Sequence, residues 1–107
     1  MYTLPRVYSD QRPIVAGLKR ATKALKKDVV RIVYKLGEDW VGQPSIFINV
    51  ILNDEAAADD YKHLGAVAGR VREKISKEVD AYEMGLNPYI AFRTLSEQAE
   101  LQDPNWE

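Results

Sequence analysis

The chain has 107 residues and a formal net charge of −1, with 46% hydrophobic and 29% charged residues, a composition typical of one soluble globular domain. It contains no cysteine, which excludes disulfides, thiol catalysis and thiolate metal sites. The first residues lack the pattern of a signal peptide, and the longest uncharged run is too short to span a membrane. We therefore expect a cytoplasmic protein that does not bind a membrane.

The charge is unevenly distributed. Residues 1–27 contain seven Lys/Arg and one Asp, whereas residues 28–107 contain eight Lys/Arg and fifteen Asp/Glu. The small net charge therefore hides a polarised molecule.

Residues 1–12 form an N-terminal segment without a clear hydrophobic period, and Pro13 then suits the first turn of a helix. Apolar residues at steps of three and four predict one buried stripe on a helix of about 15 residues: Ile14, Leu18, Ala21 and Leu25. The rest of this helix is basic, with Lys19, Arg20, Lys23, Lys26 and Lys27. These cations are either an anion-binding patch for nucleic acid or an acidic protein, or a solvated surface partly neutralised by acids elsewhere in the fold.

Two runs of strand-favouring residues follow at 29–36 and 46–53. One face of each run is apolar, through Val30, Ile32, Tyr34 and Leu36 and through Ile46, Ile48, Val50 and Leu52. This period of two predicts an antiparallel pair whose apolar face is covered by helices. The loop at residues 37–45 is too long for a tight turn. On the opposite face, an exposed apolar patch predicts a homodimer: Val29, Val33, Phe47 and Ile51.

Asn53 or Asp54 can cap a second helix, whose apolar stripe is Ala57, Tyr61, Leu64, Ala68, Val71 and Ile75. Gly65 and Gly69 lie inside it, where each costs roughly 1 kcal/mol relative to alanine. We therefore expect another backbone to approach closely there, from a sheet, the first helix or a second subunit. His63, with Asp59 and Asp60 one turn earlier, offers too few ligands for a metal site. We expect no metal and no cofactor.

Residues 79–84 predict a short helical continuation that Gly85 ends in a left-handed conformation. Residues 89–95 predict a third strand, which Pro88 can open without disrupting it. The last segment, 96–107, is an acidic tail whose first helical turn is capped by Ser96.

Trp106 in this polar tail either anchors the tail in a basic groove of a partner, with the acids steering the encounter, or folds back onto its own domain. The predicted partner-binding residues are Glu97, Glu100, Leu101, Asp103 and Trp106.

The elements together predict one α+β domain over residues 13–95. We expect a two-layer sandwich in which a three-stranded, mainly antiparallel sheet carries two main helices on one face. No phosphate-binding glycine loop, nucleophile elbow or paired-histidine motif is present, so we expect a protein without enzymatic activity. Trp40, Phe47 and Tyr89 are candidates for stacking on single-stranded nucleic acid if their ring faces are open. The alternative is that Phe47 packs beneath a helix.

The order helix, strand, strand, helix, short helix, strand resembles the type II KH-like arrangement of the ribosome-binding factor A family. Residues 50–55, 68–72 and 88–92 are similar to that family in rhythm. This resemblance implies an RNA-binding, ribosome-associated domain.

Residues 37–47, with Gly37-Glu38-Asp39-Trp40, and residues 92–101 look like a group of short bacterial proteins associated with HEPN-domain proteins, in the style of a toxin–antitoxin pair. The chain lacks the Gly-Ser and paired-Asp motif of nucleotidyltransferase antitoxins, so neutralisation would work by binding. We predict an antitoxin-like protein-interaction module, with RNA binding as the alternative. An enzyme or ligand-binding domain whose site is built only in an oligomer is a third possibility.

Overall fold

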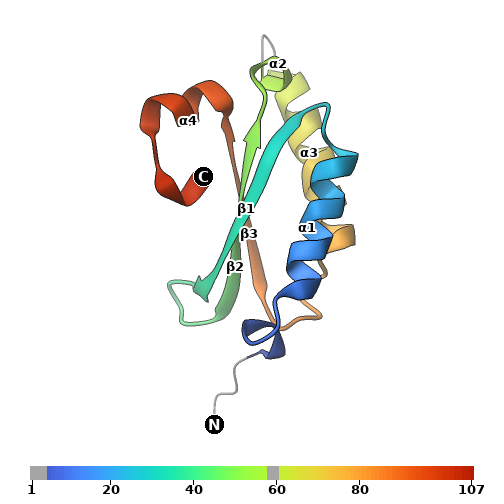
Figure 1. Ribbon diagram of the computed structural model, residues 1–107, viewed down its shortest axis with the longest axis vertical. Coiled ribbons are helices and arrows are strands. Elements are labelled where there is room, and N and C mark those ends of the chain that lie inside the picture. Colours follow the sequence, from blue (N-terminus) through green and yellow to red (C-terminus); the bar gives the residue numbers. More distant parts are fainter. Residues whose placement is uncertain (1–4, 58–60) are drawn as a thin grey trace.

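The α+β class predicted from the sequence is the class of the computed structural model, which describes residues 5–57 and 61–107. The chain forms α1 (Arg12–Ala24), β1 (Val29–Glu38), β2 (Pro44–Leu52), α2 (Asp54–Ala57), α3 (Tyr61–Glu78), β3 (Asn87–Thr94) and α4 (Leu95–Leu101). Two short 3-10 helices are η1 (Arg6–Tyr8) and η2 (Pro104–Trp106). In Figure 1, α1 and α3 lie on one side of the sheet, while α4 and the C-terminal segment lie on the other.

The three strands form one mixed sheet in the order β1-β2-β3. β1 and β2 pair antiparallel, as predicted, but β2 and β3 pair in parallel, which corrects the expectation of a mainly antiparallel sheet. The connection explains the difference. α3 carries the chain back along the sheet, and a strand that follows such a crossover beside its predecessor runs in the same direction. β1 and β3 are the two edges of this sheet.

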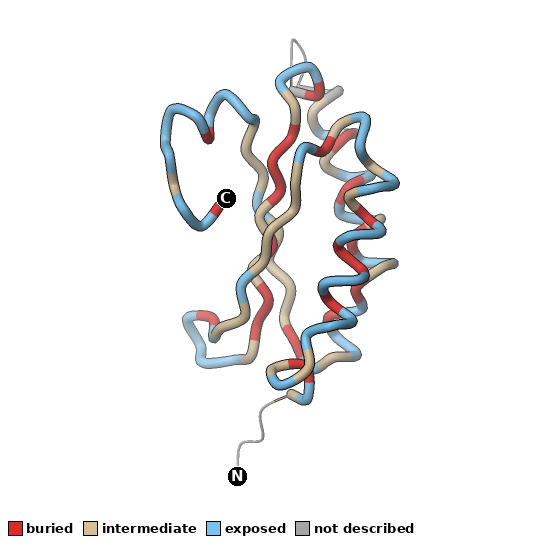
Figure 2. Tube along the Cα trace, viewed as in Figure 1, coloured by how far each residue is buried: buried red, intermediate tan, exposed pale blue. Residues whose placement is uncertain are grey.

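The hydrophobic core lies between β2 and the two long helices. The apolar face of β2 is at most 1% exposed, through Ile46, Ile48, Val50 and Leu52. The helices cover it with the side chains of Ile14, Leu18, Ala21, Val67, Val71 and Ile75. Figure 2 shows buried positions recurring along both long helices. Burial of each large aliphatic side chain contributes roughly 1.5–3 kcal/mol, so this layer supplies much of the driving force for folding.

A bulge near the start of β1 changes which valine faces the core. The register shifts between Val29 and Arg31, and Val29 is 4% exposed whereas Val30 is 40% exposed. This is the reverse of the predicted alternation, because the extra residue of a bulge interrupts the period of two. Val29 and the fully buried Ile51 are therefore not part of an exposed apolar patch, and the homodimer stays a prediction without that support.

Local hydrogen bonds move two predicted boundaries. Residues 79–84 are not helical: 79 and 80 have no regular structure, and 81–85 form turns. The side chain of Asp80 accepts the N–H of Glu83, a bond that competes with helical bonding. The cap of α4 is Thr94, which forms a capping box with Glu97. The predicted cap, Ser96, instead donates its hydroxyl to Asp54.

Two backbones approach each other closely at Gly17, whereas the predicted close approach was at Gly65 and Gly69. A Cβ on Gly17 would lie 2.4 Å from the carbonyl oxygen of Glu78, at the end of α3. A Cβ on Gly65 or Gly69 would meet no described atom within 4 Å. Within the described part of the chain, the close-approach prediction is therefore wrong for Gly65 and Gly69, and approach by a second subunit stays a prediction.

Candidate functional site

The loop between β1 and β2 is short and internally hydrogen-bonded. The N–H of Asp39 donates to the carbonyl of Gln43 at 3.0 Å, and the N–H of Gly42 donates to the carbonyl of Asp39 at 3.0 Å. Gly42 has a φ of +79°, a left-handed conformation that glycine adopts at little cost. The strands therefore continue to Glu38 and from Pro44, and the loop is shorter than the predicted range of 37–45.

The carboxylate of Asp39 connects this loop to β3. Its Oδ1 accepts the N–H groups of Val41 at 3.1 Å and Gln43 at 2.9 Å. Its Oδ2 accepts the hydroxyl of Tyr89 at 2.9 Å and the amide of Asn87 at 3.4 Å. These bonds, with that of Gln43 the strongest, hold the pKa of Asp39 below its ordinary value, although desolvation opposes them. In return, the bond to Asp39 raises the pKa of Tyr89.

Three aromatic side chains gather beside the loop, on the face of the sheet opposite α1 and α3. The rings of Phe47 and Tyr89 stack with centroids 5.4 Å apart, because the parallel register places the two residues side by side. The ring of Trp40 lies 5.7 Å from that of Tyr89, yet Trp40 is 84% exposed and Val41 is 64% exposed. We call Trp40, Val41, Phe47 and Tyr89 the hairpin surface.

The hairpin surface has the physical character of a binding anchor. Tryptophan and tyrosine are enriched among the few residues that carry most of the free energy of protein association. Because Asp39 already orders the loop, less conformational entropy is lost when a partner binds. Phe47 lies on the face of the sheet opposite α1 and α3, where it stacks on Tyr89, so it does not pack beneath either long helix. The aromatic cluster is open on the side of Trp40.

The C-terminal tail packs on its own domain. Trp106 is 7% exposed, and the guanidinium of Arg93 stacks over its ring at 4.3 Å. The carbonyl of Trp106 accepts Nε of Arg31 at 3.0 Å, and the carbonyl of Asn105 accepts the side-chain amide of Asn49 at 3.1 Å. Of the two possibilities that the sequence left open for Trp106, the structure has the one in which this side chain folds back onto the sheet.

The other predicted partner-binding residues of the tail have separate positions. Glu97 belongs to the capping box of α4, and Asp103 pairs with Arg93 at 3.5 Å. Glu100 is exposed, and Leu101 is 59% exposed. The tail thus presents Glu100 and Leu101 to solvent, while Trp106 contributes to the fold.

The cations of the first helix do not form one patch. Arg20 pairs with Glu78 of α3 at 2.6 Å, so the predicted neutralisation by an acid elsewhere in the fold occurs for this residue. Lys19 and Lys23 border a groove between α1 and β1. Lys26 and Lys27 are exposed beyond the end of α1.

The sequence indicated Trp40, Phe47 and Tyr89 as candidates for stacking on nucleic acid, but it did not indicate the role of Asp39. A local signal was present, because an aspartate followed three residues later by glycine between two strands is typical of a side-chain-stabilised turn. No local signal indicates the bond from Tyr89, which lies 50 residues away.

The side chains of His63, Asp59 and Asp60 lie outside the described residues. Within the part of the chain that the structure describes, no three His, Asp or Glu side chains are close enough to share a metal ion. No helix in residues 5–57 and 61–107 combines the length and apolarity needed to cross a bilayer.

The chain matches no family model, no curated protein and no solved structure.

Proposed function

We propose that the chain is a non-enzymatic protein-interaction module whose hairpin surface binds a partner protein, with Trp40 as the anchor. The observation that carries the proposal is an 84% exposed tryptophan on a loop that backbone hydrogen bonds and the carboxylate of Asp39 hold in place. Leaving so large an apolar side chain in water forgoes a free-energy gain that burial against a partner would recover.

An antitoxin-like role is the specific form of this proposal. The stretch that resembles HEPN-associated proteins, residues 37–47, contains Trp40, Val41 and Phe47, three of the four residues of the hairpin surface. In this role the chain neutralises its partner by covering it, with no group transfer. The tail then contributes indirectly, since Trp106 stabilises the sheet that carries the hairpin.

Affinity purification of the tagged protein from its own host, as wild type, Trp40→Ala and Leu101→Ala, tests the proposal. Leu101 is a matched exposed apolar residue on the tail, 59% exposed. We expect wild type and Leu101→Ala to retain the same polypeptide partner and Trp40→Ala to lose it, with Kd raised by a factor of about 30 or more, as for a hot-spot residue. Loss with Leu101→Ala alone would assign binding to the tail, and retention by all three would overturn the proposal.

RNA binding is the second candidate, favoured by Lys19 and Lys23, for which no ion pair is found among the described residues, and by the open ring of Trp40. The order of elements also resembles the KH-like arrangement, except that the short helix α2 precedes α3 and does not follow it. We expect single-stranded RNA to bind no tighter than micromolar at physiological salt. A nanomolar complex, with a log–log salt slope of roughly −3 to −5 and abolished by Lys23→Glu with Lys27→Glu, would replace the protein-binding proposal.

A further inference from the structure

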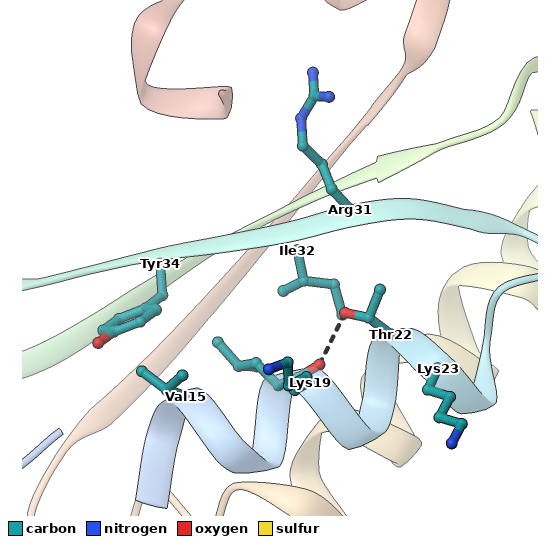
Figure 3. A pocket seen from close by; sticks show the side chains of 8 residues that line it. Val15, Lys19, Thr22, Lys23, Arg31, Ile32 and Tyr34 are labelled. Carbon is teal, nitrogen blue, oxygen red and sulfur yellow. Dashed lines mark hydrogen bonds between the residues drawn. The ribbon is translucent and has the colours of Figure 1, made fainter. Parts of the chain in front are cut away.

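A groove of about 440 Å³ lies between α1 and the outer edge of β1. Its apolar lining is Val15, Leu18 and Ile32, with Tyr34 at one end and Lys19 and Lys23 on its border. Figure 3 shows Val15 facing Tyr34 across the groove, whereas Arg31 points to the other face of the sheet. We call this the edge groove. Its volume is within the range of about 300–1,000 Å³ typical of binding pockets.

The backbone of β1 offers unpaired hydrogen-bonding groups along this groove. β1 is an edge strand, and no strand in residues 5–57 and 61–107 pairs with its outer side. The bond from the N–H of Asp39 to Gln43 sets the alternation of the antiparallel ladder. From Arg31 to Asp39, the backbone N–H and C=O groups of odd-numbered residues therefore point to β2. The backbone groups of the even-numbered residues, including the N–H groups of Ile32 and Tyr34, point outward. Such an edge is a template for one more strand.

The N-terminal segment limits the open part of this edge. The hydroxyl of Tyr34 donates to the side chain of Gln11. The hydroxyl of Tyr8 donates to the carbonyl of Gly37 at 2.9 Å, which also places the N-terminal segment beside this end of β1, although that carbonyl points to β2. The open edge therefore runs from the bulge near Val30 to Tyr34, a length that accommodates a short extended segment rather than a long strand.

The charge around the groove selects the occupant. α1 contains no acidic residue, Lys19 and Lys23 border the groove, and Lys35 is exposed on the other face of β1. A second copy of this chain, paired through its own β1, would bring the same cations of α1 face to face, which is unfavourable. A segment that carries carboxylates meets cations on both faces of the strand.

We propose that the edge groove binds a short acidic segment of a partner protein, which adds to β1 as a fourth strand. Its backbone bonds to the N–H groups of Ile32 and Tyr34, its alternate apolar side chains enter the groove, and its carboxylates meet Lys19, Lys23 and Lys35. Strand addition takes affinity from main-chain bonds and specificity from alternate side chains. This site is separate from the hairpin surface and does not depend on Trp40.

A synthetic heptapeptide with valine and leucine at alternate positions and glutamate elsewhere is the probe. Titrated into the ¹⁵N-labelled protein, it should shift the amide signals of Ile32 and Tyr34 and slow their hydrogen exchange. A version with lysine for glutamate should bind at least about tenfold more weakly. Of the two versions N-methylated on alternate amides, only the one methylated on the amides that face β1 should weaken by a similar factor, because the other amides of an added strand point to solvent. Trp40→Ala should leave the affinity unchanged, so this site and the hairpin surface are tested separately.

Charge reversal identifies the lysines that give the edge groove its preference for an acidic peptide. Lys19→Glu with Lys23→Glu should reverse the preference toward the lysine peptide. The matched control, Lys26→Glu with Lys27→Glu, makes the same change in net charge beyond the groove and should keep the preference for glutamate. Three results would overturn the proposal: no shift at Ile32 and Tyr34 with the peptide at about 1 mM, binding unaffected by N-methylation, or dimerisation through β1 in the absence of peptide. Displacement of the peptide by single-stranded RNA, without protection of β1, would also overturn it and assign the lysines to phosphate.

Discussion

Replacing Trp106 by alanine tests whether the C-terminal tail is part of the folded domain. The side chain is 7% exposed and packs under the guanidinium of Arg93. A buried tryptophan removes about 150–250 Å² from water, which at about 25 cal/mol per Å² corresponds to roughly 4–6 kcal/mol. This figure is an upper bound, since the unfolded chain already buries part of its surface.

The tail can leave the sheet without unfolding the core, which reduces the expected loss further. Once the ring is gone, the tail that begins at α4 regains conformational entropy of about 1–2 kcal/mol per residue released. We therefore expect the free energy of unfolding to fall by about 2–4 kcal/mol, which extends below the range of about 3–5 kcal/mol for buried aromatic truncations. Denaturation in urea measures this loss, and hydrogen exchange of the α4 amides shows whether the tail detaches.

Leu101→Ala is the control for this prediction, because Leu101 lies on the same segment but is 59% exposed. We expect its effect to stay within about 0.5 kcal/mol, as for most surface substitutions. If Trp106→Ala changes the free energy of unfolding as little as Leu101→Ala and leaves the hydrogen exchange of the α4 amides unchanged, the tail does not need this side chain to stay on the sheet. The reasoning from burial is then refuted.

Three further substitutions test the loop and the helix packing. The pKa of Asp39 is lowered in the folded state, so its stabilisation is present above the unfolded pKa of about 3.9 and is lost as pH falls through the folded value. Asp39→Asn should therefore lose less stability than wild type in urea titrations between pH 5 and about 2, and an identical pH dependence would contradict this role. Gly17→Ala, whose Cβ would lie 2.4 Å from the carbonyl of Glu78, should cost about 1–3 kcal/mol. Gly65→Ala, with open space, should stabilise α3 by about 0.5–1 kcal/mol, and equal melting temperatures for the two variants would contradict the packing argument.

The elements whose hydrophobic pattern is local could be predicted from the sequence. The stripe through Ile14, Leu18 and Ala21 and the alternation through Ile46 and Ile48 place side chains on one face within a single element. Those side chains are buried as expected. The α+β class follows from the order of such elements, so it too was determined by the sequence.

The direction of β3 and the bulge in β1 were decided by tertiary structure. The sequence contained a helix between two strands but did not show that the strands are neighbours, and only neighbouring strands joined by a crossover are constrained to be parallel. Likewise, the extra residue at Val30 follows from pairing with β2, since either valine alone suits a strand.

The two tryptophans show most clearly what the sequence determined by itself and what it did not. The sequence established that a tryptophan in a polar segment needs a partner surface. It did not determine that Trp106 finds one on its own sheet, through Arg31 and Arg93, while Trp40 stays exposed. Burial of a side chain depends on residues distant in sequence that only the tertiary fold brings together. The candidate site therefore lies on the β1–β2 hairpin and not on the tail.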